Sequence, residues 1–203
     1  MIGAINATKN SYITTIDESI HYFYKKEKSF IEQKQVALDA PDFGSALDQA
    51  LAARSNVVAL GDIKDRKMLS TVLGASKRSL IICRITAPEL PDAIRKLMEL
   101  VPGPEQSAAR ARLAAHLGGI IFVTSLPGKS GNEVPATEVV RWRESAQEVI
   151  LNPEKTGRIV EELAQIEGSV ERLGESVQRL REKELITQET ASQYLKKDAS
   201  CSV

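Results

Sequence analysis

The stretch Val57-Val58-Ala59-Leu60-Gly61-Asp62 decides the fold, because it is an apolar run that ends in an acidic residue. A second run of this kind, Tyr12-Ile13-Thr14-Thr15-Ile16-Asp17-Glu18, precedes it. Short apolar runs bounded by polar residues are typical of strands buried in a parallel sheet. Ligands of open α/β sheets bind beyond the carboxyl ends of the strands, so Asp17, Glu18 and Asp62 are candidate site residues.

The composition is that of a globular protein. The 203 residues allow one domain of ordinary size plus an appendage, and 42% are hydrophobic and 27% charged. Lys+Arg and Asp+Glu both number 27, and this net charge of zero argues against a nucleic-acid partner, although a local basic patch remains open.

The cysteines and the apolar runs indicate a reduced, cytoplasmic setting. Cys83 and Cys201 are too few for a disulfide framework or a CxxC metal site, and we expect Cys83 to be an inert core residue. We therefore expect no metal site built from cysteine or histidine. No apolar run approaches the ~18 residues that would span a bilayer.

Strand and helix signals alternate through the first three quarters of the chain. We expect a helix at the start, strands at 12–17, 21–24 and 29–38, and helices begun by Asp42 and Asp65. Further on we expect a strand at 79–85, helices after Pro88 and at 105–117, and a hairpin of strands over 119–126 and 134–140. This order predicts a mostly parallel α/β sheet, finished by a hairpin.

The character of the sequence changes after Pro153, where no strand signal remains. Apolar residues at 163, 166, 170, 173, 177 and 180 follow a 3.5-residue repeat. We interpret this seam as a helix docked on the body or on a neighbouring subunit. Thr187 begins a last short helix. The expected division is therefore 1–152 for the α/β core and 153–203 for a helical segment.

Gly128-Lys129-Ser130 matches the end of a Walker A phosphate loop, but we reject that interpretation. The motif needs a glycine where Val123 stands and a helix next, whereas Gly131-Asn132 and Pro135 follow with strand-like alternation. A hairpin turn is the better prediction, and no other phosphate-loop motif occurs in the sequence.

The acidic residues allow two interpretations. Asp62 is either a Walker B-like acid that handles Mg²⁺ and the attacking water or an ordinary acid at a strand end, and Asp65 is then the N-cap of the next helix. Asp17 and Glu18 are adjacent in a strand, so only one of them can face a site.

The order of these segments resembles the C-terminal part of the secretion ATPases of type II secretion and type IV pili, closest to the pilus-retraction (twitching motility) branch. The stretch 13–20 looks like the Asp box of that family, with 32–36 at the proper distance, and 57–65 looks like Walker B. The matches continue through 94–102, 113–126 and 182–195.

The resemblance implies a truncated RecA-like core of the P-loop NTPase type that lacks its phosphate loop. Family members are hexameric motors that use ATP and Mg²⁺ and work with inner-membrane platform proteins of a pilus or secretion system. It also implies catalytic roles for Asp17, Glu18 and Asp62 and nucleotide-binding roles for Asp62, Asp65 and Thr86. The partners would be copies of the chain or related ATPase subunits, with the protein cytoplasmic or peripheral at the inner membrane.

Several positions depart from the family pattern. The Walker B glutamate falls on Asp62, one methylene shorter, and a misplacement of ~1 Å can cost ~10²-fold in rate. The Asp-box order is inverted at Asp17 and Glu18, and the His-box histidine falls on Thr86. We therefore expect a degenerate homologue, a pseudo-enzyme without ATP turnover on its own. The alternatives are a C-terminal fragment of an active hexameric ATPase and a non-enzymatic helical adaptor.

Overall fold

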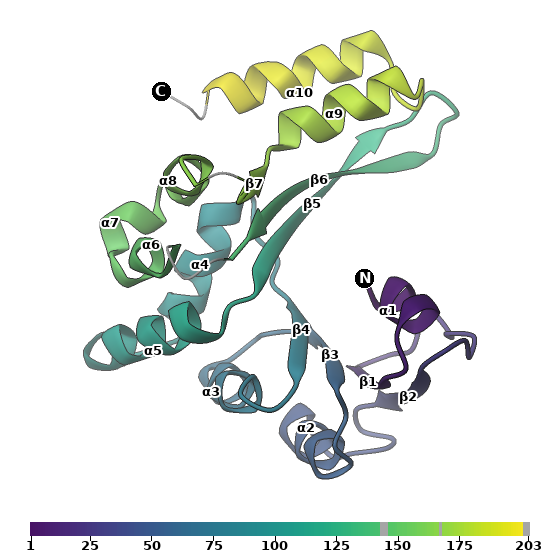
Figure 1. Cartoon of the computed structure of the whole chain (residues 1–203), viewed down its shortest axis with the longest axis vertical. Helices are drawn as coiled ribbons and strands as arrows, with labels where there is room; N and C mark the ends of the chain where they lie inside the picture. Colours follow the sequence, from purple (N-terminus) through teal and green to yellow (C-terminus); the bar gives the residue numbers. More distant parts are fainter. Residues whose placement is uncertain (143–145, 167, 201–203) are drawn as a thin grey trace. The chain divides into compact units, whose positions relative to one another are not determined.

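Figure 1 shows the computed structural model of the chain, which describes residues 1–142, 146–166 and 168–200. The chain forms two compact units. Unit 1 comprises Met1–Ala87 and Lys96–Gln106, and unit 2 comprises Pro88–Arg95 and the chain from Ser107 onward.

Unit 1 is built on a four-stranded sheet in which all neighbouring strands are parallel, in the order β2-β1-β3-β4. The strands are β1 (Tyr12–Asp17), β2 (Phe30–Gln35), β3 (Val57–Asp62) and β4 (Leu80–Arg84). The central strands β1 and β3 are the most buried, and Ile13, Ile16 and Val58 are fully buried. The predicted mixed α/β fold with a parallel sheet is confirmed.

The helices of unit 1 begin where the sequence supplies a cap. They are α1 (Ile2–Thr8), α2 (Phe43–Ala52) and α3 (Arg66–Ala75), and α2 and α3 contact each other beside the sheet (Figure 1). Asp42 accepts a hydrogen bond from the Ser45 amide at 2.7 Å, and Asp65 accepts one from the Met68 amide at 2.8 Å. Both side chains satisfy amide groups that the first turn of a helix leaves unpaired, so the predicted N-caps are confirmed.

Two helices are shared between the units. They are α4 (Leu90–Glu99) and α5 (Gly103–His116). The last turn of α4 belongs to unit 1 and supplies one wall of the site described below.

Unit 2 is built on the predicted hairpin, β5 (Gly119–Pro127) and β6 (Glu133–Arg141), to which β7 (Val170–Glu171) adds a short antiparallel strand. Its helices are α6 (Gln147–Leu151), α7 (Pro153–Thr156), α8 (Ile159–Ala164), α9 (Leu173–Glu182) and α10 (Gln188–Ser200). The tight turn contains Gly131 at φ +77°, and the Gly128 amide donates to the Asn132 carbonyl at 2.8 Å. Gly128-Lys129-Ser130 therefore lies in a hairpin turn, as predicted.

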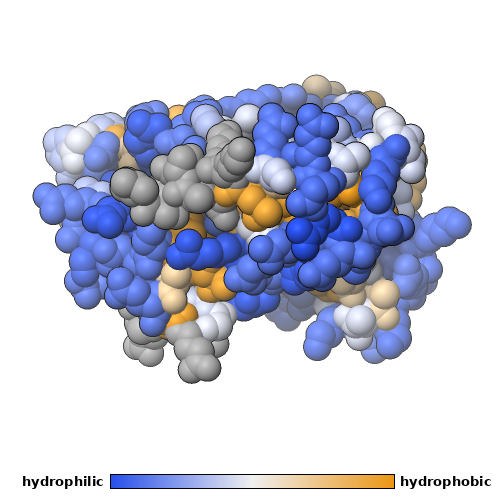
Figure 2. Space-filling view, turned by 90° about the horizontal axis from the view of Figure 1, so that it is seen from above, coloured by the Kyte–Doolittle hydropathy of each residue, from blue (hydrophilic) through white to orange (hydrophobic). Residues whose placement is uncertain are grey.

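Helices α9 and α10 lie side by side, and α9 packs on β6 (Figure 1). Their contact with the hairpin is a cluster of buried residues: Leu126, Val134, Ala136, Val177, Ile186 and Ala191. In the space-filling view from above, hydrophilic residues predominate and apolar atoms appear in smaller patches between them (Figure 2). The helices thus turn their apolar sides to the hairpin and their polar sides to solvent.

Three local predictions are wrong. Residues 21–24 form no strand, and β7 is a strand after Pro153 where none was expected. The 3.5-residue repeat is divided among α8, β7 and α9, because α8 ends at Ala164 and β7 pairs with β6 before α9 begins at Leu173. Leu163 and Val177 are fully buried within unit 2, so they do not form an exposed seam.

Cys83 is exposed, which corrects the expectation that it lies in the core. It belongs to β4, an edge strand of the sheet in unit 1, and edge position leaves more of a strand open to solvent. Within the described residues, no helix has the length and apolar character needed to cross a membrane.

Candidate functional site

The carboxyl ends of the four parallel strands meet at one edge of the sheet in unit 1. Asp17 ends β1, Asp62 ends β3 and Arg84 ends β4. In the pairing of β3 with β4, Asp62 lies opposite Arg84, after a register shift that follows Ala59. This edge is where open α/β sheets bind ligands.

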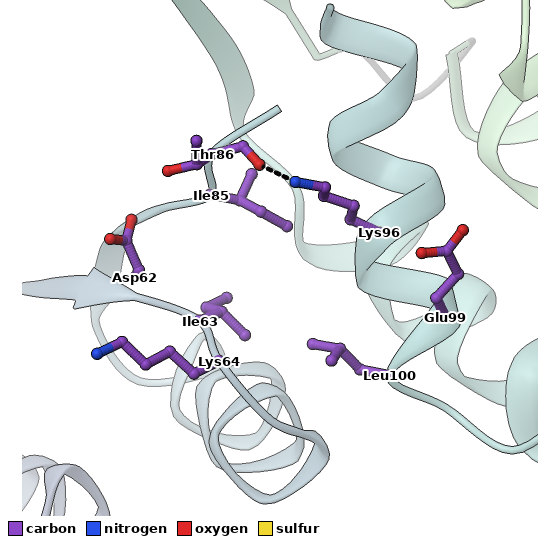
Figure 3. A pocket seen from close by; sticks show the side chains of 8 residues that line it. All are labelled: Asp62, Ile63, Lys64, Ile85, Thr86, Lys96, Glu99 and Leu100. Atoms are coloured by element: carbon purple, nitrogen blue, oxygen red, sulfur yellow. Dashed lines mark hydrogen bonds between the residues drawn. The ribbon is translucent and has the colours of Figure 1, made fainter. Parts of the chain in front are cut away.

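An open pocket of about 410 Å³ lies at this edge, wholly within unit 1 (Figure 3). Its walls come from the end of β3, the segment after β4 and the last turn of α4. The lining residues are Asp62, Ile63, Lys64, Ile85, Thr86, Lys96, Glu99 and Leu100.

The pocket brings together two of the five predicted site residues, Asp62 and Thr86. Figure 3 shows them on the same side, across from the α4 side chains. The Lys96 ammonium donates a hydrogen bond to the Thr86 backbone carbonyl at 2.6 Å. This bond ties the last turn of α4 to the segment after β4 and keeps a cation in the wall of the pocket.

Two of the acidic groups at this edge have cationic neighbours from the same unit. The Arg84 guanidinium lies 3.7 Å from the Asp62 carboxylate, Nε to Oδ1. The Lys64 ammonium forms an ion pair with Glu18, joining the end of β1 to the segment after β3. The Arg84 guanidinium thus places a positive charge beside Asp62, where a metal ion would otherwise be the cation.

The other predicted residues lie outside the pocket lining. Asp17 lies near Tyr24 instead. The pKa of the Tyr24 phenol is raised, first by burial and then by the charge of the Asp17 carboxylate. Glu18 does not line the pocket but forms an ion pair with Lys64, which does. Asp65 is the N-cap of α3.

The residues present do not fit magnesium and a triphosphate by themselves. Mg²⁺ binds through one or two carboxylates together with phosphates and waters, and phosphates in this fold are held by backbone amides of a glycine-rich turn and a lysine. The lining contains no such turn. Among the described residues no group of three or more His, Cys, Asp or Glu side chains could hold a metal ion.

Sequence reasoning missed the cationic members of the site. Arg84 ends an apolar run just as Asp62 does, and this charge at a strand end is a signal that could have been used. Lys64, Lys96 and Glu99 carry no local signal, because only the strand order and the path of α4 bring them to the pocket.

The sequence comparison and the structure comparison both find a pilus retraction ATPase PilT. No protein-family model matches the chain. The chain is 24% identical to a twitching motility protein of Neisseria gonorrhoeae over its whole length, and 24% identical to the type IV pilus retraction ATPase PilT of Pseudomonas aeruginosa over 69% of it. It covers 54% and 41% of these relatives.

The solved structures include the pilus retraction motor PilT with bound ADP, which is 29% identical over 95% of the chain with a TM-score of 0.79. The ATPase DotB of Legionella pneumophila has a TM-score of 0.83 over 97% of the chain at 14% identity, a likeness of fold alone. The chain spans 55% of each of these two structures.

The sequence comparison and the structure comparison agree. The resemblance drawn from the sequence is confirmed: the chain is homologous to type IV pilus retraction ATPases, and its fold matches that of their RecA-like ATPase domain.

Proposed function

We propose that this chain is a degenerate homologue of the pilus retraction and secretion ATPases, which takes part in a pilus or secretion assembly without turning over ATP on its own. In this proposal residues 1–152 are a partial RecA-like core and residues 153–203 are a helical segment. The partners are copies of the chain, related ATPase subunits or inner-membrane platform proteins, and the protein works in the cytoplasm at that membrane.

The observation that carries the proposal is that two of the acidic side chains at this edge of the sheet lie beside cations of the same unit. Asp62 lies beside Arg84, and Glu18 is paired with Lys64. A carboxylate that already faces a guanidinium attracts Mg²⁺ less strongly, because the ion must compete with a fixed positive charge. The pairs are exposed, so the effect is a bias against the ion rather than a block.

The substitutions noted in the sequence point the same way. Asp62 holds its carboxylate one methylene closer to the backbone than the glutamate of the family pattern, which moves it away from a water it would orient. Thr86 lines the pocket where the family has a histidine, and a hydroxyl brings no positive charge to a phosphate. In this proposal Asp17, Glu18, Asp62, Asp65 and Thr86 are remnants of the nucleotide site.

Equilibrium titration of the purified chain with Mg-ATP tests the proposal. We expect no saturable binding up to millimolar nucleotide and the same heat or fluorescence signal from Asp62→Ala, which removes the acid at the pocket. Saturable binding that Asp62→Ala weakens would contradict the proposal, because the edge acids would then be working on nucleotide.

A second candidate is that the chain is part of an active ATPase. The 29% identity to a motor solved with ADP favours it. The mass of the protein isolated from its source separates the two candidates. A product well above 22.2 kDa requires the binding measurement to be repeated on that longer protein, where saturable Mg-ATP binding would favour this second candidate.

A further inference from the structure

The connection between β1 and β2 exposes aromatic rings next to lysines. Tyr22 is 66% exposed and Phe23 is 74% exposed, and neither contributes to the buried core of unit 1. Lys25, Lys26 and Lys28 follow directly and are exposed as well. Large apolar side chains at this level of exposure need a reason when they stand together with charges of one sign.

A buried side chain holds the backbone of this connection in place. Asn6 of α1 is only 2% exposed, and its Nδ2 donates to the Lys25 carbonyl at 2.8 Å. Its Oδ1 accepts from the Glu27 amide at 3.3 Å, and its backbone carbonyl accepts from the Lys28 amide at 3.0 Å. The backbone from Lys25 to Lys28 is therefore fixed to α1, while the lysine side chains remain in solvent.

A fourth lysine lies at the same place. The Ser29 hydroxyl donates to the Lys9 carbonyl at 2.6 Å, which brings the end of α1 beside the end of the connection. Lys9 is exposed. In the described part of the chain, the ion pairs include none of these four lysines. Glu27 is the only acid among residues 22–28, so this segment together with Lys9 has a net charge of +3 although the whole chain is neutral, and the Asp17 carboxylate lies near its Tyr24 ring.

We propose that this surface, the basic-aromatic connection formed by residues 22–28 and Lys9, binds an anionic lipid membrane. Lysines near a negatively charged leaflet are attracted to it, and aromatic rings settle at the level of the headgroups. The exposed phenyl ring of Phe23 favours a lipid surface, because the ring can insert among the acyl chains below the headgroups. Duplex DNA has a charged outer surface with no apolar layer into which the ring could insert.

The expected strength follows from the charge. Each lysine close to an anionic surface strengthens binding by about fivefold, so a net charge of three corresponds to about 10²-fold over a neutral surface. The attraction acts within a Debye length and weakens as salt is added. Binding of one copy is thus reversible and dependent on ionic strength.

Co-sedimentation with vesicles tests the proposal on the full chain. The probes are vesicles of phosphatidylcholine alone and of phosphatidylcholine with one third phosphatidylglycerol, in low salt and in half-molar salt. The variants are the triple change Lys25→Gln, Lys26→Gln and Lys28→Gln, the single change Phe23→Ser, and a charge-matched control, Lys77→Gln, Lys129→Gln and Lys183→Gln, whose lysines are exposed elsewhere. Circular dichroism verifies that each variant is folded.

We expect binding to the anionic vesicles alone, lowered at least tenfold by the triple change and severalfold by Phe23→Ser, with the control unchanged. Equal binding by the control variant and the triple variant would overturn the proposal, as would equal binding to neutral vesicles. Binding to a duplex DNA fragment that is as tight as binding to vesicles and insensitive to Phe23→Ser would also overturn it, in favour of a polyanion surface.

Discussion

At the scale of single residues, two carboxylates at the edge of the sheet in unit 1 lie beside cations of the same unit. Asp62 and Glu18 each face a basic side chain from a neighbouring strand end or the segment after it. Such exposed pairs add little to stability, on the order of 0–1 kcal/mol. Their consequence is chemical, because a carboxylate that is already beside a cation is a weaker ligand for Mg²⁺.

Asp65 has a structural role that a substitution can isolate. Replacing Asp65 with Ala removes the acceptor for the Met68 amide and should lower the free energy of unfolding by about 1 kcal/mol. Asp65→Asn keeps a capping oxygen and should stay close to the parent chain. Urea unfolding of the three proteins measures this, and equal stability of all three would mean that the cap contributes nothing.

The residue scale also shows what the sequence can and cannot predict. The caps at Asp42 and Asp65 were predictable because an N-cap depends on a side chain and an amide three residues on. The pair of Asp62 with Arg84 was not, since it depends on β4 pairing with β3. The exposure of Cys83 was missed for the same reason, because strand order decides which apolar run is at the edge.

At the scale of elements, the β5–β6 hairpin is two-sided. Along β5 the exposed and more buried residues alternate, and Leu126 is fully buried while Ile121 is 46% exposed. The buried side carries α9 and α10 through the cluster around Leu126 and Val177. The hairpin is therefore the platform on which the C-terminal helices of unit 2 pack.

A pair of substitutions on β5 tests this two-sidedness. Leu126→Ala leaves a cavity in the cluster and should lower the free energy of unfolding by about 2–5 kcal/mol. Ile121→Ala, on the opposite face of the same strand, should cost about 1 kcal/mol or less. Thermal or urea unfolding compares them, and a larger loss from Ile121→Ala would show that the buried face has been assigned wrongly.

Glu171 connects β7 to its neighbours through ion pairs with Arg141 and Arg179, and we expect it to make unit 2 sensitive to acid. The hydrogen bond from Arg179, followed by the charge of Arg179 and then the more distant Arg141, holds the pKa of Glu171 below its ordinary value of 4.5. A lowered pKa means that the stabilisation is complete above the unfolded-state pKa and is lost as the pH falls through the native one.

The prediction is a difference between two pH values. Stability should fall between pH 7 and about pH 3.5 by more in the parent chain than in Glu171→Gln, because the glutamine side chain cannot take up a proton in this range. Urea midpoints at the two pH values measure the difference. If the variant and the parent lose the same stability, Glu171 is not responsible for the acid sensitivity.

The element scale shows where periodicity misleads. The 3.5-residue repeat from Leu163 to Leu180 predicted one helix, but the chain breaks and inserts β7. Leu163 and Val177 are fully buried, and Leu173 and Leu180 pack against the cluster around Val177, so these residues do not lie on one continuous helix face. A glycine within the repeat, Gly168, is the sequence signal of this break, and it adopts a positive φ of 70° in the structure.

At the scale of the whole molecule, the sequence predicted the family and the parallel sheet better than it predicted the site. Each motif was loose, but their collinear order was specific, and relatives in sequence and structure confirm it. The site depends on which side chains the fold brings together. The pocket therefore contains Asp62 and Thr86 but not Asp17, Glu18 or Asp65 in its lining.

Steady-state release of phosphate from Mg-ATP by the purified 203-residue chain tests the central claim most directly. The account predicts a rate no higher than that of Asp62→Ala measured beside it, because the residues at the sheet edge do not by themselves hold a triphosphate. Steady turnover by the parent chain that Asp62→Ala abolishes would contradict the account, and Asp62 would then be a working Walker B acid.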